Sequence, residues 1–269
     1  TGELKNIRLV DAQITGKQTV STGLKRDGNV GGLVGTLNGT TTIDGCQVYL
    51  KNVNKGLDKD KIFDEYTRIS GLVAGGLVGS TEGKTRTIQN SLAATVIQGV
   101  DSAGGLIGNI SNETYKVAVQ NSYADCYLAS DATKGKTGGL IGASGDNAGV
   151  TTKPITLENC YAAGFLDGSS TAGFSTGNLS AVKYCYSACA PLTKAALSYG
   201  TASNNDTIGT NITNVYYLSE THHPSTNIGT SMNSQKLSPE DPVTLLSDAF
   251  TKQNGDTHAY NLMSGLGLS

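Results

Sequence analysis

The chain has 269 residues and a formal net charge of −2, with 35 glycines, no tryptophan and 16% charged residues. The near balance of acidic and basic residues gives no indication of the basic surface that binds nucleic acid. No apolar run approaches the roughly 20 residues of a membrane-spanning helix. We therefore expect neither a nucleic-acid partner nor insertion into a membrane. Because glycine is frequent without occupying every third position, the composition excludes collagen and favours an all-β repeat protein with many tight turns.

A glycine-rich pentapeptide is the first repeated element along the chain. Copies of Gly-Gly-Leu-[Val/Ile]-Gly begin at Gly31, Gly75, Gly104 and Gly138, and a degenerate copy is Ala172-Gly173-Phe174. The pattern matches neither the phosphate-binding loop nor the dinucleotide-binding fingerprint. Its recurrence indicates an architectural role. We interpret each copy as a corner of the chain, the glycine corner, with its Leu or Phe side chain pointing inward.

A second signature alternates with the first and occurs seven times. It is an aliphatic residue three positions before a small or apolar anchor, and the anchors are Ile7, Cys46, Ser91, Ser122, Cys160, Cys185 and Val215. The residue directly before the anchor is Asn in five copies, Gly45 in one and Tyr184 in one. Asn and Gly best tolerate a left-handed backbone. We therefore predict a strand, a bend at this position (the asparagine corner) and a second strand in every repeat.

Stacking of these repeats predicts a parallel β-solenoid of about seven irregular rungs over residues 1–220. The charged insert 56–68 is expected to be a solvated loop or short helix. Residues 221–269 are expected to be a C-terminal cap with a short helix, packed on the solenoid. Ser238 and Pro239 are typical of a helix start, and Val243, Leu246 and Phe250 would form its apolar face.

The repeated G-G-L-[VI]-G followed by aliphatic-x-Asn-[Cys/Ser] resembles the GLUG-motif repeat family, over residues 1 to about 220. The resemblance implies a right-handed parallel β-helix in a bacterial surface or secreted protein. Such repeats occur in adhesin-like proteins and alongside IgA-specific metallopeptidases. The family brings no catalytic residues to carry over. Because the chain starts at Thr1, we expect it to be a monomeric fragment of a longer protein.

Residues with catalytic or metal-binding chemistry form no recognisable motif. His222, His223 and His258 lie outside any H-E-x-x-H pattern, so no catalytic residue, metal site or cofactor is predicted. The in-register carboxylates Asp44 and Glu158 fall three rungs apart, on the order of 14 Å, which is too far for a glycosidase pair. We expect them to form cross-rung ion pairs instead, Lys5–Asp44 and Glu158–Lys183. Five free thiols are predicted at Cys46, Cys126, Cys160, Cys185 and Cys189.

Tyrosine recurs one position after the anchor in four successive repeats, at Tyr123, Tyr161, Tyr186 and Tyr216. Alternation along the strand places these side chains, the tyrosine column, on the outer face. Stacked tyrosines would form a flat amphipathic surface for a sugar ring or a protein strand. The alternatives are that tyrosine simply suits a sheet face, or that the C-terminal segment covers it.

These observations favour a non-enzymatic extracellular adhesin or spacer module of a larger bacterial surface protein, which binds host glycan or protein. An accessory substrate-docking domain of a secreted hydrolase, such as an IgA-specific metallopeptidase, is the alternative. A polysaccharide lyase or hydrolase is the remote alternative, because loop acids would have to assemble its site.

Overall fold

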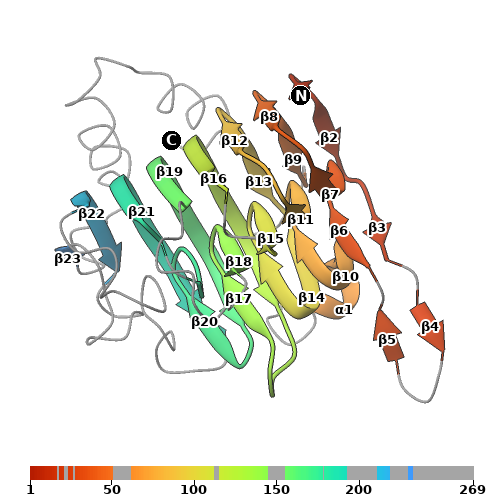
Figure 1. The fold of residues 1–269 in the computed structure, drawn as a ribbon. Coiled ribbons are helices and arrows are strands. Elements are labelled where there is room, and N and C mark those ends of the chain that lie inside the picture. The colour runs from red at the N-terminus through yellow and green to blue at the C-terminus, as the bar shows by residue number, and fades with distance from the viewer. Residues whose placement is uncertain are drawn as a thin grey trace.

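The computed structural model describes residues 1–16, 18–20, 24–26, 28–50, 62–111, 115–144, 155–177, 179–192, 211–218 and 230–232. Over these residues the chain is all-β apart from one short helix, α1 (Ile62–Tyr66) (Figure 1). The prediction of an all-β chain is therefore confirmed, and α1 falls in the charged insert where a loop or short helix was expected. No described helix is long and apolar enough to cross a membrane.

Most strands belong to one 17-stranded sheet. The strands that lead into the asparagine corners are β1 (Gly2–Lys5), β8 (Thr41–Asp44), β12 (Arg86–Gln89), β16 (Val117–Ala129), β19 (Ile155–Asp167), β21 (Ala181–Pro191) and β22 (Ile212–Leu218). In the first three of these repeats a separate strand follows the corner: β2 (Arg8–Val10), β9 (Gln47–Tyr49) and β13 (Leu92–Ala94). In β16, β19, β21 and β22 the strand runs continuously through it.

The remaining strands flank the glycine corners. Leading toward them are β3 (Ile14–Thr15), β6 (Asn29–Gly31), β10 (Ile69–Gly75), β14 (Val96–Gly104), β17 (Lys136–Gly138) and β20 (Ser170–Ala172). A separate four-stranded sheet follows them, with β7 (Val34–Asn38), β11 (Val78–Glu82), β15 (Ile107–Ile110) and β18 (Ile141–Ser144). A small antiparallel pair is formed by β4 (Gln18–Val20) and β5 (Leu24–Arg26).

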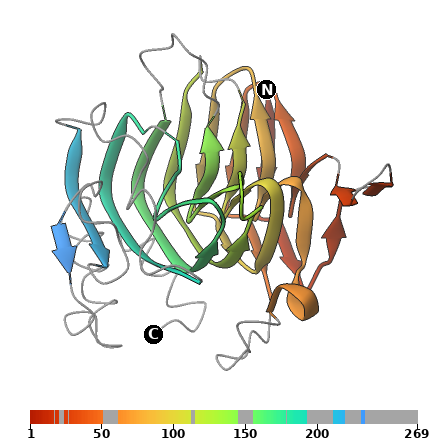
Figure 2. The same cartoon turned by 90° about the horizontal axis from the view of Figure 1, so that it is seen from below.

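The register between successive repeats follows the predicted columns. Aliphatic residues three positions before the anchors pair in parallel from repeat to repeat, in the order Leu4, Ile43, Ile88, Val119, Leu157, Val182 and Ile212. Five members of this column, from Ile43 to Val182, are at most 1% exposed, because each has a neighbouring repeat on both sides. Strands of successive repeats accordingly lie side by side in chain order along the molecule (Figure 2).

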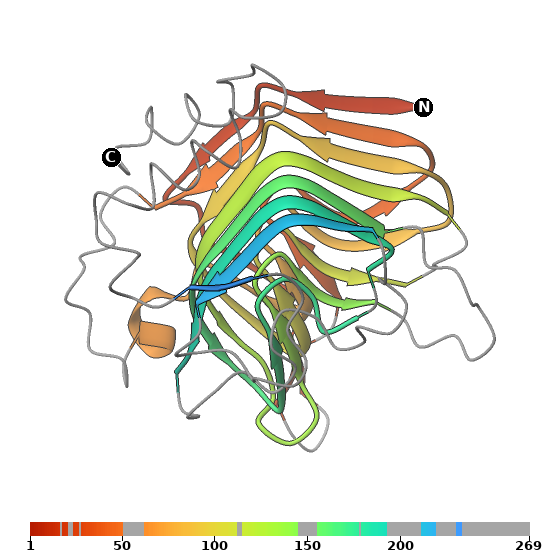
Figure 3. The same cartoon turned by 90° about the vertical axis from the view of Figure 1, so that its left-hand side faces the viewer.

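The backbone bends at every asparagine corner, as predicted. All seven corner residues have a positive φ, from 47° at Asn121 to 64° at Gly45, and the one aromatic member, Tyr184, has φ 54°. The bend breaks the two-residue alternation, so side chains on both sides of it point inward. In one repeat Ile43 and Cys46 are both fully buried. Seen along the stack, the strands of successive repeats nest as V-shaped bends (Figure 3).

Glycine corners are held by a different constraint. None of the pentapeptide glycines has a positive φ. A Cβ atom on Gly104 would overlap the carbonyl oxygen of Ile107, and one on Gly105 would overlap the carbonyl oxygen of Gly139 in the next repeat. The backbones of adjacent repeats therefore approach so closely that only glycine fits. The inward direction of the Leu or Phe side chain is confirmed, since Leu77, Leu106, Leu140 and Phe174 are fully buried.

The parallel sheet extends past the last predicted repeat. Strand β23 (Thr230–Met232) pairs in parallel with β22, with Thr230 opposite Tyr216. This strand lies within the range predicted as the cap, where the columns predict no further rung. The rest of the predicted cap, including the expected helix, lies outside the described residues.

Candidate functional site: the tyrosine column and the asparagine ladder

The four tyrosines of the column pair directly across adjacent repeats, as the sequence predicted. Tyr123 pairs with Tyr161, Tyr161 with Tyr186, and Tyr186 with Tyr216. The rings of Tyr161 and Tyr186 stack at 5.5 Å between centroids with an interplanar angle of 7°, and those of Tyr123 and Tyr161 are tilted at 6.3 Å and 52°. The column thus forms a continuous aromatic strip across the strands.

The strip lies on the outer face of the sheet, opposite the main core. The buried residues Leu92, Tyr123 and Tyr186 form a hydrophobic cluster distinct from the one inside the repeats, and Tyr161 and Tyr216 pack against it. Tyr123 is only 3% exposed and Tyr186 only 4%. Two of the four tyrosines are therefore buried and the other two are partly buried, whereas an open flat surface was expected from the sequence. Its role in ligand binding stays a prediction.

Burial dominates the electrostatics of these side chains. Desolvation raises the pKa of Tyr123 and Tyr161 far above the usual value for tyrosine, and the nearby carboxylate of Asp125 adds to the effect. The phenols therefore stay neutral at physiological pH. They offer apolar ring surface and neutral hydroxyls, which suits recognition by packing rather than acid–base chemistry.

A second aromatic pair, which sequence reasoning missed, lies four residues along the same strands. Tyr127 and Phe165 occupy paired positions in β16 and β19, and their rings stack at 5.2 Å with an interplanar angle of 28°. Because residues two apart share one face of a strand, this pair lies on the same outer face as the tyrosine column. The signal was available in the sequence as a second in-register aromatic position.

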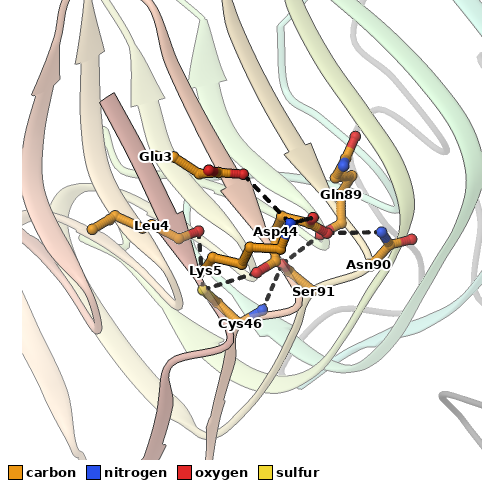
Figure 4. Close-up of polar contacts among 8 residues, drawn as sticks. All are labelled: Glu3, Leu4, Lys5, Asp44, Cys46, Gln89, Asn90 and Ser91. Carbon is orange, nitrogen blue, oxygen red and sulfur yellow. Dashed lines mark hydrogen bonds and ion pairs between the residues drawn. The ribbon is translucent and has the colours of Figure 1, made fainter. Parts of the chain in front are cut away.

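A ladder of amide hydrogen bonds runs along the asparagine corners. Asn159 Nδ2 donates to Asn121 Oδ1 at 2.9 Å, and Asn121 Nδ2 donates to Asn90 Oδ1 at 3.1 Å. Asn90 Nδ2 then donates to Asp44 Oδ1 at 2.8 Å (Figure 4). We call these four residues the asparagine ladder. At its other end, Asn159 Oδ1 is buried with no hydrogen-bond partner among the described residues, because the next corner residue is Tyr184.

Asp44 closes the ladder electrostatically. Its other carboxylate oxygen lies 3.4 Å from Lys5 Nζ, which confirms the predicted Lys5–Asp44 ion pair. The hydrogen bond from Asn90 is the main cause that holds the pKa of the Asp44 carboxyl below its usual value, and Lys5 contributes further. The carboxylate is therefore ionised, and each of its oxygens has a partner. This arrangement indicates a structural role for Asp44 at the end of the ladder.

Among the described residues, the second predicted ion pair, Glu158–Lys183, does not form. Glu158 and Lys183 pair in register, as expected, but Glu158 Oε2 accepts a hydrogen bond from Gln120 Nε2 at 3.4 Å. Glu158 is three strands from Asp44 in its column, with Gln89 and Gln120 between them. The register therefore keeps these two carboxylates apart, as predicted, and does not assemble them into an acid pair.

The five cysteines are all buried and none of them forms a disulfide, as predicted. Cys46 and Cys160 each follow an asparagine corner. The Cys46 thiol donates to the carbonyl oxygen of Asp44 at 3.5 Å, and the Cys160 thiol donates to the carbonyl oxygen of Glu158 at 3.2 Å. Burial raises the pKa of the Cys189 thiol to about 12. These thiols behave as small core side chains. Among the described residues no group of His, Cys, Asp and Glu could hold a metal ion, and the three histidines lie outside that part of the chain.

Fold and column together define a class of repeat protein, with parallel strands stacked in register and an aromatic strip on the outer face. Comparisons with protein-family models, with curated proteins and with solved structures found no match to this chain. The likeness to GLUG-motif repeats accordingly depends on the repeated residues themselves, and it enters below as a proposal.

Proposed function

We propose that the described repeats form a right-handed parallel β-helix of the kind that GLUG-motif repeats imply. Each described repeat pairs in parallel with the next, and every asparagine corner has the same left-handed backbone. A chain that returns to the same sheet by parallel crossovers does so with right-handed connections in nearly all known cases. The two observations and this rule together support a coil that advances by one strand spacing per turn.

We further propose that this coil is a non-enzymatic module of a bacterial surface or secreted protein and binds a glycan or a protein through its outer aromatic face. The observation that carries this proposal is the in-register tyrosine column, with Tyr161 and Tyr186 stacked at 5.5 Å. The spacing of about 4.8 Å between strands repeats a ring at intervals that suit an extended polymer. Neutral phenols with large apolar rings favour sugar faces and apolar peptide side chains.

A binding array of host glycans and proteins, probed with the whole chain, tests this function. We expect a saturable ligand whose affinity falls in Tyr161→Ala, because that ring is partly accessible and central in the column. Tyr115→Ala is the matched control, because Tyr115 is 43% exposed and lies outside the column. Unchanged binding in both Tyr161→Ala and Tyr186→Ala, with thermal stability retained, would contradict the proposal.

A further inference from the structure

The core of the repeats is open at the N-terminal end of the stack. Six aliphatic side chains pack against the main core while they stay partly exposed, and five of them belong to the first repeat: Leu4, Leu9, Ile14, Leu33 and Val34. Residues in the same columns one repeat later are covered, since Ile43 and Leu77 are fully buried. A repeat covers its neighbours, so the first repeat lacks a cover on its outer side.

The backbone edge of strand β1 is accessible at the same end. β1 pairs in parallel with β8, and the amides of Gly2 and Asn6 donate to carbonyl oxygens on that side, at 2.9 Å each. Successive residues of a strand direct their N–H and C=O groups to opposite edges, so those of Glu3 and Lys5 point away from β8. Residues 1–3 and 5–8 are exposed, which leaves this edge open to a further strand.

The sequence Glu3-Leu4-Lys5 is complementary to itself in an antiparallel pair. With Leu4 opposite Leu4 of a second copy, Glu3 stands opposite Lys5 and Lys5 opposite Glu3. These are the residues whose backbone groups point to the edge, so each opposed pair can exchange both of its N–H···O bonds. The two neighbouring symmetric registers with this hydrogen-bond pattern would place Glu3 opposite Glu3, or Lys5 opposite Lys5. Like charges directly opposite are destabilising, so charge selects the register centred on Leu4.

We infer that β1 is a homodimer interface, at which it pairs antiparallel with β1 of a second copy of this chain about a two-fold axis at Leu4. A two-fold interface uses the same patch on both copies, and this strand meets that requirement in charge and in hydrogen bonding. The two Leu4 side chains meet on the inner face of the sheet, where each is otherwise partly exposed. The side chains of Lys5 and Glu3, 54% and 57% exposed, are accessible to the opposite charges of the second copy.

This interface is independent of the function proposed above. The tyrosine column lies on β16, β19, β21 and β22, and β1 belongs to the first repeat. Edge strands that resist association commonly carry charges that oppose pairing, whereas the opposite charges of Glu3 and Lys5 favour it in the register centred on Leu4. A monomer, as expected from the sequence, is the outcome that the dimer excludes.

Two charge variants of the full chain test the interface and its register. Glu3→Lys places a second ammonium group opposite Lys5, and Lys5→Glu places a second carboxylate opposite Glu3, so each variant opposes its own pairing. Lys5→Glu is combined with Asp44→Asn, which removes the repulsion from the Asp44 carboxylate and keeps an acceptor for Asn90. A mixture of the two variants again places opposite charges at both positions.

The matched controls are Asp101→Lys and Asp44→Asn alone. Asp101 is 47% exposed and lies on β14, so its replacement changes the net charge by the same amount as Glu3→Lys at a place away from the edge. Sedimentation equilibrium measures the mass and the dissociation constant of each protein. Circular dichroism verifies that each variant retains the sheet.

We expect the unsubstituted chain to reach twice its mass of 27.7 kDa as its concentration rises. The dissociation constant should increase about tenfold or more in each charge variant, return to the unsubstituted value in their mixture and stay unchanged in the controls. An unsubstituted chain that stays monomeric up to its solubility limit would overturn the inference. Dimers that are insensitive to both charge variants, or variants whose mixture stays monomeric, would overturn it as well, because the interface would then lie elsewhere.

Discussion

The two kinds of corner in each repeat restrict the sequence in different ways. At the asparagine corner the backbone is left-handed, so the restriction acts on φ, and Asn, Gly45 and even Tyr184 satisfy it. At the glycine corner φ is ordinary, and the restriction is space, because a Cβ on Gly105 would overlap the backbone of the next repeat. A dihedral preference costs about 1 to 2 kcal/mol to violate, whereas an overlap with backbone atoms forces two repeats apart.

This difference explains why the residue at the asparagine corner varies, whereas the second position of the glycine corner is glycine in every copy. Tyr184 occupies an asparagine corner with φ 54° and is only 3% exposed, so its buried side chain offsets an unfavourable backbone. The second position of the glycine corner offers no such compensation, and it is glycine even in the degenerate copy, at Gly173. The residue at the asparagine corner of a repeat can therefore change while the glycine corner of that repeat is retained.

The largest expected effect comes from filling a glycine corner. Gly105→Ala places a Cβ against the carbonyl oxygen of Gly139 and the side chain of Ala124. We expect a loss of about 3 kcal/mol or more in the free energy of unfolding, because neither neighbour is a flexible side chain. Urea denaturation followed by circular dichroism measures it. Gly2→Ala, which meets no atom within 4 Å, is the control, and equal losses in the two variants would refute the spatial explanation.

An intermediate effect is expected at the asparagine corner. Asn121→Ala places alanine at φ 47° and removes one amide bond on each side, to Asn90 and from Asn159. We expect a loss of about 2 to 3 kcal/mol in unfolding free energy, and a smaller loss in Asn121→Gly, which keeps the dihedral freedom. Asn214→Ala isolates the dihedral cost, because Asn214 has φ 50° and lies outside the asparagine ladder. If alanine and glycine at position 121 are equivalent, the backbone explanation fails.

The smallest effect is a pH dependence at the end of the ladder. The pKa of Asp44 is lowered in the folded protein, so its stabilising contribution is present above the unfolded value of about 4 and is lost as pH falls through the folded value. For a pair near the surface we expect a fraction of a kcal/mol. Urea midpoints between acidic and neutral pH should therefore decline less steeply in Asp44→Asn. A parallel decline in the two proteins would show that Asp44 is not linked to folding.

Much of the fold could be predicted because repeats provide their own alignment. The aliphatic column from Leu4 to Ile212 and the left-handed corners both follow from positions that recur at fixed offsets. The Lys5–Asp44 pair and the stacking of the tyrosine column follow from the same register. Each of these features depends only on which residues lie opposite each other, and alignment of the repeats determines that.

Features that depend on side-chain rotamers, or on what packs against the outer face of the sheet, were not predictable in this way. The register placed Lys183 beside Glu158, but the side chain that reaches Glu158 belongs to Gln120. Alternation placed the tyrosines outside, but could not reveal that Tyr123 is buried there. Strand β23 was missed because Thr230, Ser231 and Met232 carry none of the repeated residues, although their backbone pairs in the same register.

The asparagine ladder also gives the stack a direction. Every amide nitrogen in it donates toward the first repeat, from Asn159 through Asn121 to Asn90, and the series ends on the Asp44 carboxylate. A duplicated repeat inserted between Asn90 and Asn159 would accept one bond and donate one, so the chain would lengthen without stranding a polar group. Beyond Tyr184 an added asparagine would find no partner on that side. Duplicated repeats can thus be added in the middle of the asparagine ladder. At its two ends the series of asparagines stops, at Asp44 on one side and before Tyr184 on the other.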